Sequence, residues 1–399
     1  MEDLTIVNAR EVVTLSGHKK PAAGKKIEEL NILKNVSISV KDGKISNIGK
    51  PLNAKKTIDA EGKVIIPGFV DSHTHLIFGG NRAMEFEQRL NGKSYKEIAA
   101  SGGGIFNTVG MTRNASEKDL FETGMKRLDY ALKWGTTTIE IKSGYGLNYK
   151  EEMKILRVIK KLSQKHPVKI ISTFLGAHEI PRDKDRNKYI DELIKMMPEV
   201  KDYAKFCDVF CEKGVFTKEE SKKILMSAKK TGFGLKIHAD ELSSCGGSEL
   251  AGELGAVSAD HIVYPSDKGL KLMKKNGTIA TLLPGACLYL EHRTPAKKFI
   301  DMGIPIALGS DFNPGSSPVL AMPIIMSLSC ILLKLTPAQA LTASTINSAY
   351  ALGIGDKVGS IEVGKSADML LLNVDSWQEI PYWLGFNPVD LIVREGKEI

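Results

Sequence analysis

The sequence predicts an α/β fold: a (β/α)8 barrel of the TIM type with a small β-sandwich domain formed by both termini. Eight apolar, strand-like segments alternate with helical ones in the middle of the chain, and short strand-like segments fill both ends. The 399 residues also exceed the ~250 that such a barrel typically needs. We therefore divide the chain into residues 1–65, a barrel over 66–354, and residues 355–399. An open doubly wound sheet is the structural alternative.

The two ends share short runs of alternating hydrophobicity, separated by turns. In the N-terminal part, Asp42-Gly43 is typical of a hairpin turn between two such runs. Two β-rich ends that flank one α/β middle indicate that both ends build one sandwich. The predicted strands cover residues 36–40, 45–48, 57–62, 63–66, 359–363, 369–374 and 391–393.

Strands and helices alternate through the middle of the chain. Ser116 is expected to cap a helix that ends at Gly135, and Thr336 is expected to cap another that has Pro337 at its first position. Eight strands with helical crossovers fit a closed parallel barrel. The predicted strands are residues 68–73, 136–141, 168–175, 204–211, 234–238, 257–262, 277–283 and 304–308.

Composition and charge argue against several classes of protein. The five cysteines are odd in number and widely spaced, so we expect no disulfide framework, a reducing compartment and a cytoplasmic location. Cys207 and Cys211 lie in an apolar run and are interpreted as core residues. Residues 1–6 lack the pattern of a signal peptide, and the longest apolar run, 319–333, is too short for a membrane span. The net charge of +8 comes from scattered lysines, so no nucleic-acid partner is expected.

Polar side chains that suit metal chemistry follow the predicted barrel strands. Active sites of such barrels form at the C-terminal ends of the strands. A single histidine there would more often be a structural residue than a ligand. Five histidines together with an aspartate reverse that expectation: His73, His75, His178, His238, His261 and Asp311.

His73-Thr74-His75 is the strongest of these signals. Residues two apart on a strand point to the same face, so both imidazoles can reach one cation. His238 and Asp311 would complete a set of three nitrogens and one oxygen, which suits zinc or divalent iron. Such a metal lowers the pKa of a bound water toward ~7 and so supplies a nucleophile.

Three residues are predicted to carry the catalysis around that cation. Asp311 can accept a proton from the attacking water and pass it to a leaving nitrogen. Glu241, three residues after His238, suits proton transfer, although taken alone it could be a solvated loop acid. His261 can donate to the oxygen of the scissile carbonyl.

Residues 66–75, with the sequence IPGFVDSHTH, resemble the signature of the amidohydrolase superfamily. His238, His261 and Ser310-Asp311 follow in the order of that family, so the resemblance covers the whole barrel. Sandwich-like ends are also usual in the superfamily, and the match is highly specific.

A narrower resemblance is to the imidazolonepropionase family. It implies hydrolysis of 4-imidazolone-5-propanoate to N-formimidoyl-L-glutamate, a small-molecule substrate, a homodimer, and one zinc or iron ion per subunit. The implied metal ligands are His73, His75, His238 and Asp311. The implied substrate contacts are Arg82, Tyr145, His178, Glu241, Asn313, Gly315 and Ser316, with Arg82 placed to grip the propionate tail. The matching stretches are residues 78–82, 102–105, 140–147, 173–178, 238–241 and 309–316.

The chain departs from the family pattern at two places. Trp383 and Pro388 stand where many members have histidines, in a segment outside the barrel. Lys213, after the fourth barrel strand, keeps a carboxylated lysine that bridges two metals formally possible, whereas the resemblance favours one metal, with Glu212 at the strand end.

Two rival functions stay open at this point. Another amidohydrolase, such as a nucleobase deaminase, also uses the His238-x-x-Glu241 pattern. A non-catalytic scaffold on the same fold is the alternative from a different class, although such proteins typically lose metal ligands and all four candidates are present here.

Overall fold

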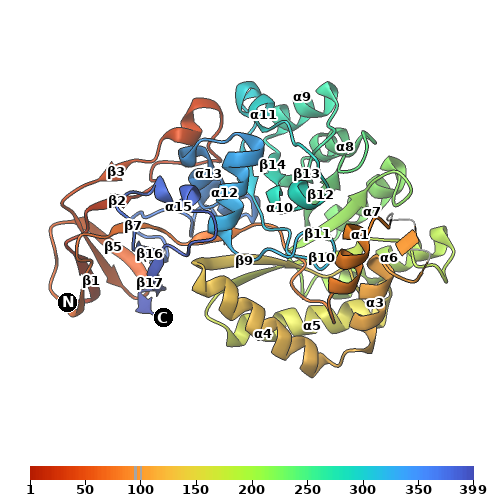
Figure 1. Cartoon of the computed structure of the whole chain (residues 1–399), viewed down its shortest axis with the longest axis horizontal. Helices are drawn as coiled ribbons and strands as arrows, with labels where there is room; N and C mark the ends of the chain where they lie inside the picture. Colours follow the sequence, from red (N-terminus) through yellow and green to blue (C-terminus); the bar gives the residue numbers. More distant parts are fainter. Residues whose placement is uncertain (94–96, 99–100) are drawn as a thin grey trace.

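The computed structural model describes residues 1–93, 97–98 and 101–399. Strands from the two ends of the chain, red-brown and blue in Figure 1, lie together on one side of the molecule. The barrel and its helices occupy the other side. The N- and C-termini lie near each other on the sheet side.

Eight parallel strands form the barrel sheet in the described part of the chain, in sequential order from β8 to β15. Each one overlaps a segment predicted from the sequence, and the fold class is confirmed. The strands are β8 (Phe69–Asp71), β9 (Thr136–Lys142), β10 (Lys169–Ala177), β11 (Phe206–Cys211), β12 (Gly234–Ala239), β13 (Ser258–His261), β14 (Ile279–Leu282) and β15 (Ile306–Leu308).

The barrel closes between its first and last strands through residues just beyond their ends. Thr74 and Phe312 form a parallel bridge. The backbone N–H of Asp311 donates to the carbonyl oxygen of His73 at 2.9 Å, and that of His75 donates to Phe312 at 3.0 Å. This closure excludes the open doubly wound sheet, and it brings two predicted metal-ligand segments side by side.

Helices cover the outside of the barrel (Figure 1). Ser116 caps α4 in a reciprocal capping box with Asp119, and Thr336 caps α13, whose first residue is Pro337, as predicted. Among the described residues, no helix has both the length and the apolar character that crossing a membrane requires. The helices are α1 (Ala83–Leu90), α3 (Ile105–Asn114), α4 (Glu117–Lys133), α5 (Tyr149–Lys165), α6 (Arg186–Val200), α7 (Lys218–Lys230), α8 (Gly247–Leu254), α9 (Asp267–Asn276), α10 (Pro284–Tyr289), α11 (Ala296–Met302), α12 (Met322–Leu333), α13 (Pro337–Ala343), α14 (Ile346–Ala351) and α15 (Glu379–Tyr382).

Two further sheets are formed by strands from the ends of the chain. Their orders are β5-β4-β1-β6 and β18-β17-β16-β7-β2-β3 among the described residues, so the second sheet mixes strands from both termini. The strands are β1 (Glu2–Val7), β2 (Glu11–Val13), β3 (Ile32–Leu33), β4 (Ser37–Lys41), β5 (Lys44–Gly49), β6 (Ala54–Asp59), β7 (Val64–Pro67), β16 (Met369–Leu372), β17 (Val389–Arg394) and β18 (Lys397–Glu398).

One predicted strand is wrong. Residues 359–363 form a bend and irregular backbone that leads into a turn, rather than a strand. Ile361 is buried in the sandwich core, and its N–H donates to the carbonyl oxygen of Thr14 at 2.8 Å. The apolar side chain is therefore buried without strand pairing, which a hydrophobicity pattern does not distinguish from a short strand.

Candidate active site

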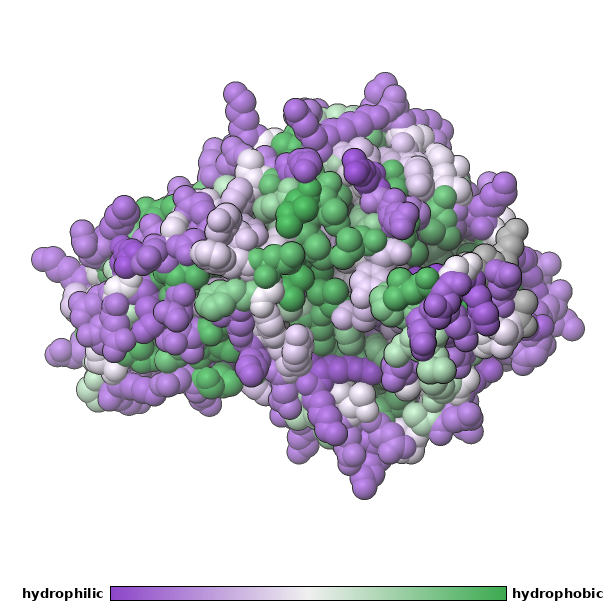
Figure 2. Space-filling view, viewed as in Figure 1, coloured by the Kyte–Doolittle hydropathy of each residue, from purple (hydrophilic) through white to green (hydrophobic). Residues whose placement is uncertain are grey.

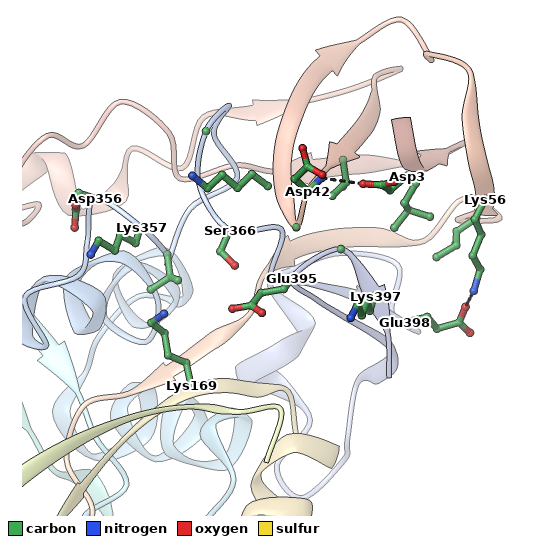
Figure 3. A pocket seen from close by; sticks show the side chains of 18 residues that line it. Asp3, Asp42, Lys56, Lys169, Asp356, Lys357, Ser366, Glu395, Lys397 and Glu398 are labelled. Atoms are coloured by element: carbon green, nitrogen blue, oxygen red, sulfur yellow. Dashed lines mark hydrogen bonds and ion pairs between the residues drawn. The ribbon is translucent and has the colours of Figure 1, made fainter. Parts of the chain in front are cut away.

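Two cavities of very different character lie at opposite ends of the barrel. The larger, about 920 Å³, is bordered by terminal-sheet residues and by Lys169 at the start of β10. Its side chains mix both charges, as in the Lys56–Glu398 ion pair of Figure 3. The smaller, about 340 Å³, lies at the C-terminal ends of the strands and contains predicted site residues. It is lined by His75, Arg82, Glu85, Arg89, Ile98, Ile105, Tyr145, His178, Phe210, His238, Glu241, Leu242, His261, Leu290, Asp311, Asn313, Gly315 and Ser316.

The four proposed metal ligands converge at the base of the smaller cavity. Nε2 of His75 lies 3.3 Å from Nε2 of both His73 and His238. Oδ1 of Asp311 lies 3.4 Å from Nε2 of both His73 and His75. In a tetrahedral site with bonds of ~2.1 Å, neighbouring ligand atoms lie ~3.4 Å apart. The donor types and their spacing therefore fit a divalent cation.

The backbone at the barrel closure places three of these ligands. His73 and His75 follow β8, and Asp311 follows β15 with a positive φ of 52°. Asp71 Oδ1 accepts the N–H of Ser310 at 2.9 Å, which ties the two strand ends together. The second carboxylate oxygen of Asp311 accepts from the Asn313 side chain at 3.0 Å, so its first oxygen is left to face the histidines.

The burial of these side chains and the carboxylates around them favour the binding of a cation. Burial lowers the pKa of His75 to about 3, which leaves its imidazole neutral and able to donate a lone pair. Burial also disfavours protonation of His73, but the nearby carboxylates of Asp260 and Asp311 raise its pKa to about 9. The acidic surroundings of His73 thus attract a positive charge to the place where the four ligand atoms meet.

Glu241 and His261 stand beside the ligand cluster. Oε1 of Glu241 lies 3.3 Å from Nδ1 of His261. Burial, together with the negative charge of Asp311 and Glu212, raises the pKa of Glu241 to about 8, so its carboxyl is protonated near neutral pH. Burial lowers the pKa of His261 to about 3. The pair therefore combines a carboxylic acid with a neutral imidazole.

The residues around Glu241 direct its side chain into the cavity. Asp240, its neighbour, has a left-handed backbone with φ of 51°. The Asp240 carboxylate accepts N–H groups at the start of α8, including that of Ser248 at 2.9 Å. Glu212 accepts the N–H of Leu242 at 2.9 Å. Adjacent acids thus have different tasks: Asp240 caps a helix, and Glu241 faces the site.

All the predicted substrate contacts line the cavity. Nε of Arg82 donates to Glu85 Oε2 at 2.7 Å, so the guanidinium is held in place. A Cβ at position 315 would lie only 2.3 Å from Nη1 of Arg82, which explains why glycine stands there. Asn313 Oδ1 accepts the N–H groups of Gly315 and Ser316, both at 2.8 Å. Asn313 therefore shapes this loop as well as facing the cavity.

His178 and Tyr145 form an aromatic wall opposite this loop. The His178 ring stacks on that of His75, with centroids 4.9 Å apart and planes 15° from parallel. Nδ1 of His178 lies 3.1 Å from the carbonyl oxygen of Gly144, which accepts its proton and leaves Nε2 without one. Burial raises the pKa of Tyr145, so its hydroxyl stays protonated and can donate.

The structure places Lys213 away from the proposed metal centre. Its side chain is exposed, and it does not line the cavity. Glu212 sits at the strand end as expected and is used to hold the following loop. Trp383 is also exposed and donates to Glu379 at 3.0 Å, outside the barrel.

Several cavity residues were missed by sequence reasoning. Glu85 fixes Arg82, and Arg89 Nη2 lies 3.3 Å from the carbonyl oxygen of Gly315. Their spacing of three and seven residues after Arg82 is that of one helix face, which was the available signal. Phe210 lies just before the end of a strand, where an apolar residue is indistinguishable from the core.

Comparisons with known proteins agree with this geometry. The model of the amidohydrolase family matches residues 64–399. The imidazolonepropionase of Thermoanaerobacter pseudethanolicus is 47% identical over 401 residues, covering 98% of this chain and 96% of that protein. That of Symbiobacterium thermophilum is 45% identical over 414 residues, covering 100% and 97%.

Solved structures agree on the fold. A triazine hydrolase variant superposes with a TM-score of 0.76 at 16% identity, covering 99% of this chain and 94% of that one. A zinc-bound adenosine deaminase from Xanthomonas campestris gives 0.70 at 20%, covering 99% and 92%. The deaminase alternative is not favoured, because its support is likeness of fold alone. The chain belongs to the imidazolonepropionase family of amidohydrolases.

Proposed function

We propose that this site hydrolyses the cyclic amide of 4-imidazolone-5-propanoate to N-formimidoyl-L-glutamate, a step of histidine degradation. One observation carries the proposal: three imidazole nitrogens and one carboxylate oxygen, linked by contacts of 3.3–3.4 Å, converge at the base of a cavity that also presents Arg82. Family membership supports a hydrolase that acts on a ring C–N bond.

His73, His75, His238 and Asp311 would hold one divalent ion, zinc or iron. When bound, such a cation polarises a carbonyl oxygen and makes a coordinated water acidic enough to act as a nucleophile near neutral pH. A cavity of about 340 Å³ has room for one small ring and its tail.

Proton transfer falls to the acids beside the ligands. The carboxylate of Asp311 accepts a proton from the attacking water, whose oxygen bonds to the ring carbonyl carbon. Glu241, protonated near neutral pH, donates its proton to the ring nitrogen as the C–N bond breaks. Transfer of the proton from Asp311 to Glu241 then returns both acids to their starting state. One water is consumed, and the carboxylic acid formed releases its proton to the formimidoyl nitrogen of the product or to solvent, which leaves the carboxylate. His261 donates a hydrogen bond to the developing oxyanion.

The rest of the cavity orients the substrate. Arg82, already held by Glu85, presents its terminal nitrogens to the propionate carboxylate. Tyr145 and His178 pack against the ring, and the Tyr145 hydroxyl donates to it. Gly315 and Ser316 offer backbone and hydroxyl contacts on the opposite side, held in place by Asn313.

A turnover assay tests the proposal. Purified protein loaded with zinc or iron should consume the imidazolone chromophore and form N-formimidoyl-L-glutamate, and should release no ammonia from nucleobases. Ammonia release without imidazolone loss would favour a deaminase. A metal content near zero with no turnover would favour the scaffold.

Three finer features belong to the same proposal. We expect one metal ion per subunit, a homodimer, and a cytoplasmic location that suits the free cysteines. Elemental analysis gives the identity and stoichiometry of the metal, and light scattering after size-exclusion chromatography gives the mass of the assembly.

A further inference from the structure

A cluster of five charged side chains lies inside the barrel beside the proposed metal ligands. All are fully buried, with 0% of their surface exposed. Burying an ion costs free energy unless it is paired, so the desolvation of these side chains must be offset by contacts among them. The five are Glu140, Lys142, Asp208, Lys236 and Asp260.

Lys142 pairs with all three acids. Its Nζ lies 2.7 Å from Asp208 Oδ2, 2.9 Å from Glu140 Oε2 and 3.5 Å from Asp260 Oδ2. Of these three contacts, the one with Asp208 is a hydrogen bond, and those with Glu140 and Asp260 are ion-pair contacts. The ammonium group is thus the centre of the acidic cluster.

Lys236 reaches the same acids from β12. Its Nζ lies 3.2 Å from Glu140 Oε1 and 3.6 Å from Asp260 Oδ2, and donates to the carbonyl oxygen of Ser72 at 3.0 Å. Ser72 immediately precedes the first metal-ligand histidine. Lys236 therefore links the acids to the backbone that carries His73.

Two of the acids contact metal-ligand histidines through the ring nitrogen on the far side from the cation. Oδ2 of Asp260 lies 2.6 Å from Nδ1 of His73, and Oδ2 of Asp208 lies 3.0 Å from Nδ1 of His238. The contact of His73 is a hydrogen bond, and a carboxylate that accepts the Nδ1 proton leaves the Nε2 lone pair for the metal and fixes the ring orientation. Asp208 faces His238 at ion-pair distance and also accepts its backbone N–H at 3.2 Å. Glu140 touches neither histidine in the described contacts; it accepts a hydrogen bond from Thr173 and lies within ion-pair distance of the two lysines.

The two ammonium groups supply the positive charge that this acidic cluster requires. His73, Glu140 and Asp260 bring possible ligand atoms within 4.8 Å of one another, which is a donor set that could itself attract a cation. Both lysine Nζ atoms lie within 3.2 Å of a Glu140 oxygen and within 3.6 Å of Asp260 Oδ2. The lysine ammonium groups thus lie where a second cation would bind this donor set.

We propose that Lys142 and Lys236 are positioning residues of the metal centre. Their ammonium groups hold Asp208 and Asp260, and these carboxylates hold His238 and His73 with Nε2 toward the cation. The inference rests on the proposed metal site and extends it to two residues that touch neither the metal ligands' Nε2 atoms nor the cavity.

The test measures metal affinity separately from stability. Lys142→Met and Lys236→Met are compared with wild type by Zn²⁺ competition against a chelating dye, by the visible spectrum of the Co²⁺-loaded protein, and by the melting temperature without metal. We expect a Zn²⁺ dissociation constant about 10–100-fold weaker in both variants and an altered Co²⁺ spectrum.

Lys365→Met is the matched control. Lys365 is also buried, and its Nζ bonds Gly355, Ser360 and Glu362 at 2.7, 2.6 and 3.1 Å, outside the barrel centre. It should lower the melting temperature and leave Zn²⁺ affinity and the Co²⁺ spectrum as in wild type. The same pattern in the Lys142 and Lys236 variants would show a purely structural role and overturn the inference.

A charge-balanced variant covers the case in which Lys142→Met does not fold. Lys142→Gln/Glu140→Gln removes one positive and one negative charge and keeps both ligand-contacting acids. It should fold and still bind Zn²⁺ more weakly, because Asp208 loses its ammonium partner; unchanged affinity would overturn the inference. His75→Ala separates the two proposals: if it binds Zn²⁺ as wild type does, the proposed metal site itself is wrong.

Discussion

The two ends of the barrel differ in cavity volume and in the burial of their polar side chains, and the larger cavity is not the candidate active site. The groove near the N-terminal ends of the strands encloses about 920 Å³, against about 340 Å³ at the C-terminal ends. In the large groove, charges are paired at the surface, as in Lys56–Glu398, whose side chains are 57% and 41% exposed. At the small cavity, His73, His75 and Asp311 are almost completely buried.

The difference lies in what the polar atoms face. Exposed ion pairs gain ~0–1 kcal/mol, and their ions remain hydrated. Buried ligand atoms that crowd together without hydration gain little until a cation joins them. Exposed apolar side chains also occur on α1 and α10, such as Leu90 and Leu288. Figure 2 shows hydrophobic side chains gathered over the α10 region. The convergence of buried ligand atoms, and not the cavity volume, identifies the end of the barrel that carries the candidate active site.

Asp311→Ala should have the largest effect. It removes a metal ligand and the base together, and we expect turnover to fall by about 10⁴-fold or more, toward background. Steady-state assays combined with metal analysis measure both losses. Turnover like that of wild type would break the assignment of this end as the active one.

Glu241→Gln should lower kcat by about 10²–10⁴-fold, because it removes a general acid while keeping the shape of the side chain. The carboxyl donates only when protonated, so the activity of wild type should fall as pH rises through the pKa of Glu241. Burial raises that pKa to about 8, and a cation nearby lowers it, so the alkaline limb of kcat/KM should lie at or below about 8. An unchanged limb in the variant would assign the titration to another group.

Arg82→Ala should act mainly on KM. A charged hydrogen bond to the carboxylate tail contributes about 1.5–3 kcal/mol, so KM should rise about 10–100-fold with a small change in kcat. For a substrate analogue that lacks the carboxylate, the variant and wild type should have similar KM values. A KM equal to that of wild type would contradict the tail-grip role.

Lys56→Ala, at the opposite end, should have the smallest effect. It also removes one cation from a cavity wall, so it is the counterpart of Arg82→Ala. Because its ion pair with Glu398 is exposed, we expect kcat, KM and the melting temperature to stay within about twofold or about 2 °C of wild type. A large loss of activity would show that the big groove takes part in the function.

Much of this contrast was accessible from the sequence. The eight barrel strands follow from apolar runs at regular spacing, and the ligands follow from histidines at the ends of those runs. His73-Thr74-His75 was informative because two imidazoles on one face are rarely structural. The Ser116 and Thr336 helix starts were also predictable, because capping depends on local residues.

The features that escaped prediction depend on contacts between distant strands. A lysine inside a strand, such as Lys142 or Lys236, normally indicates a solvent-facing position, and only closure of the barrel shows it to be buried. Asp208 and Asp260 gave no signal, because their histidine partners are 30 and 187 residues away. Residues 359–363 mimic a strand because burial and strand pairing leave the same hydrophobic pattern.

The junction of β8 with the segment after β15 has a consequence for assembly of the protein. The N–H of Asp311 donates to the carbonyl oxygen of His73. The proposed ligands of one cation therefore follow the first and last barrel strands, β8 and β15, or lie on β12 between them. A chain in which the last barrel strand, β15, has not yet docked lacks the complete set of metal ligands. A metal at 100 times its dissociation constant would therefore stabilise the closed barrel by ~2.7 kcal/mol relative to forms in which the last strand is undocked.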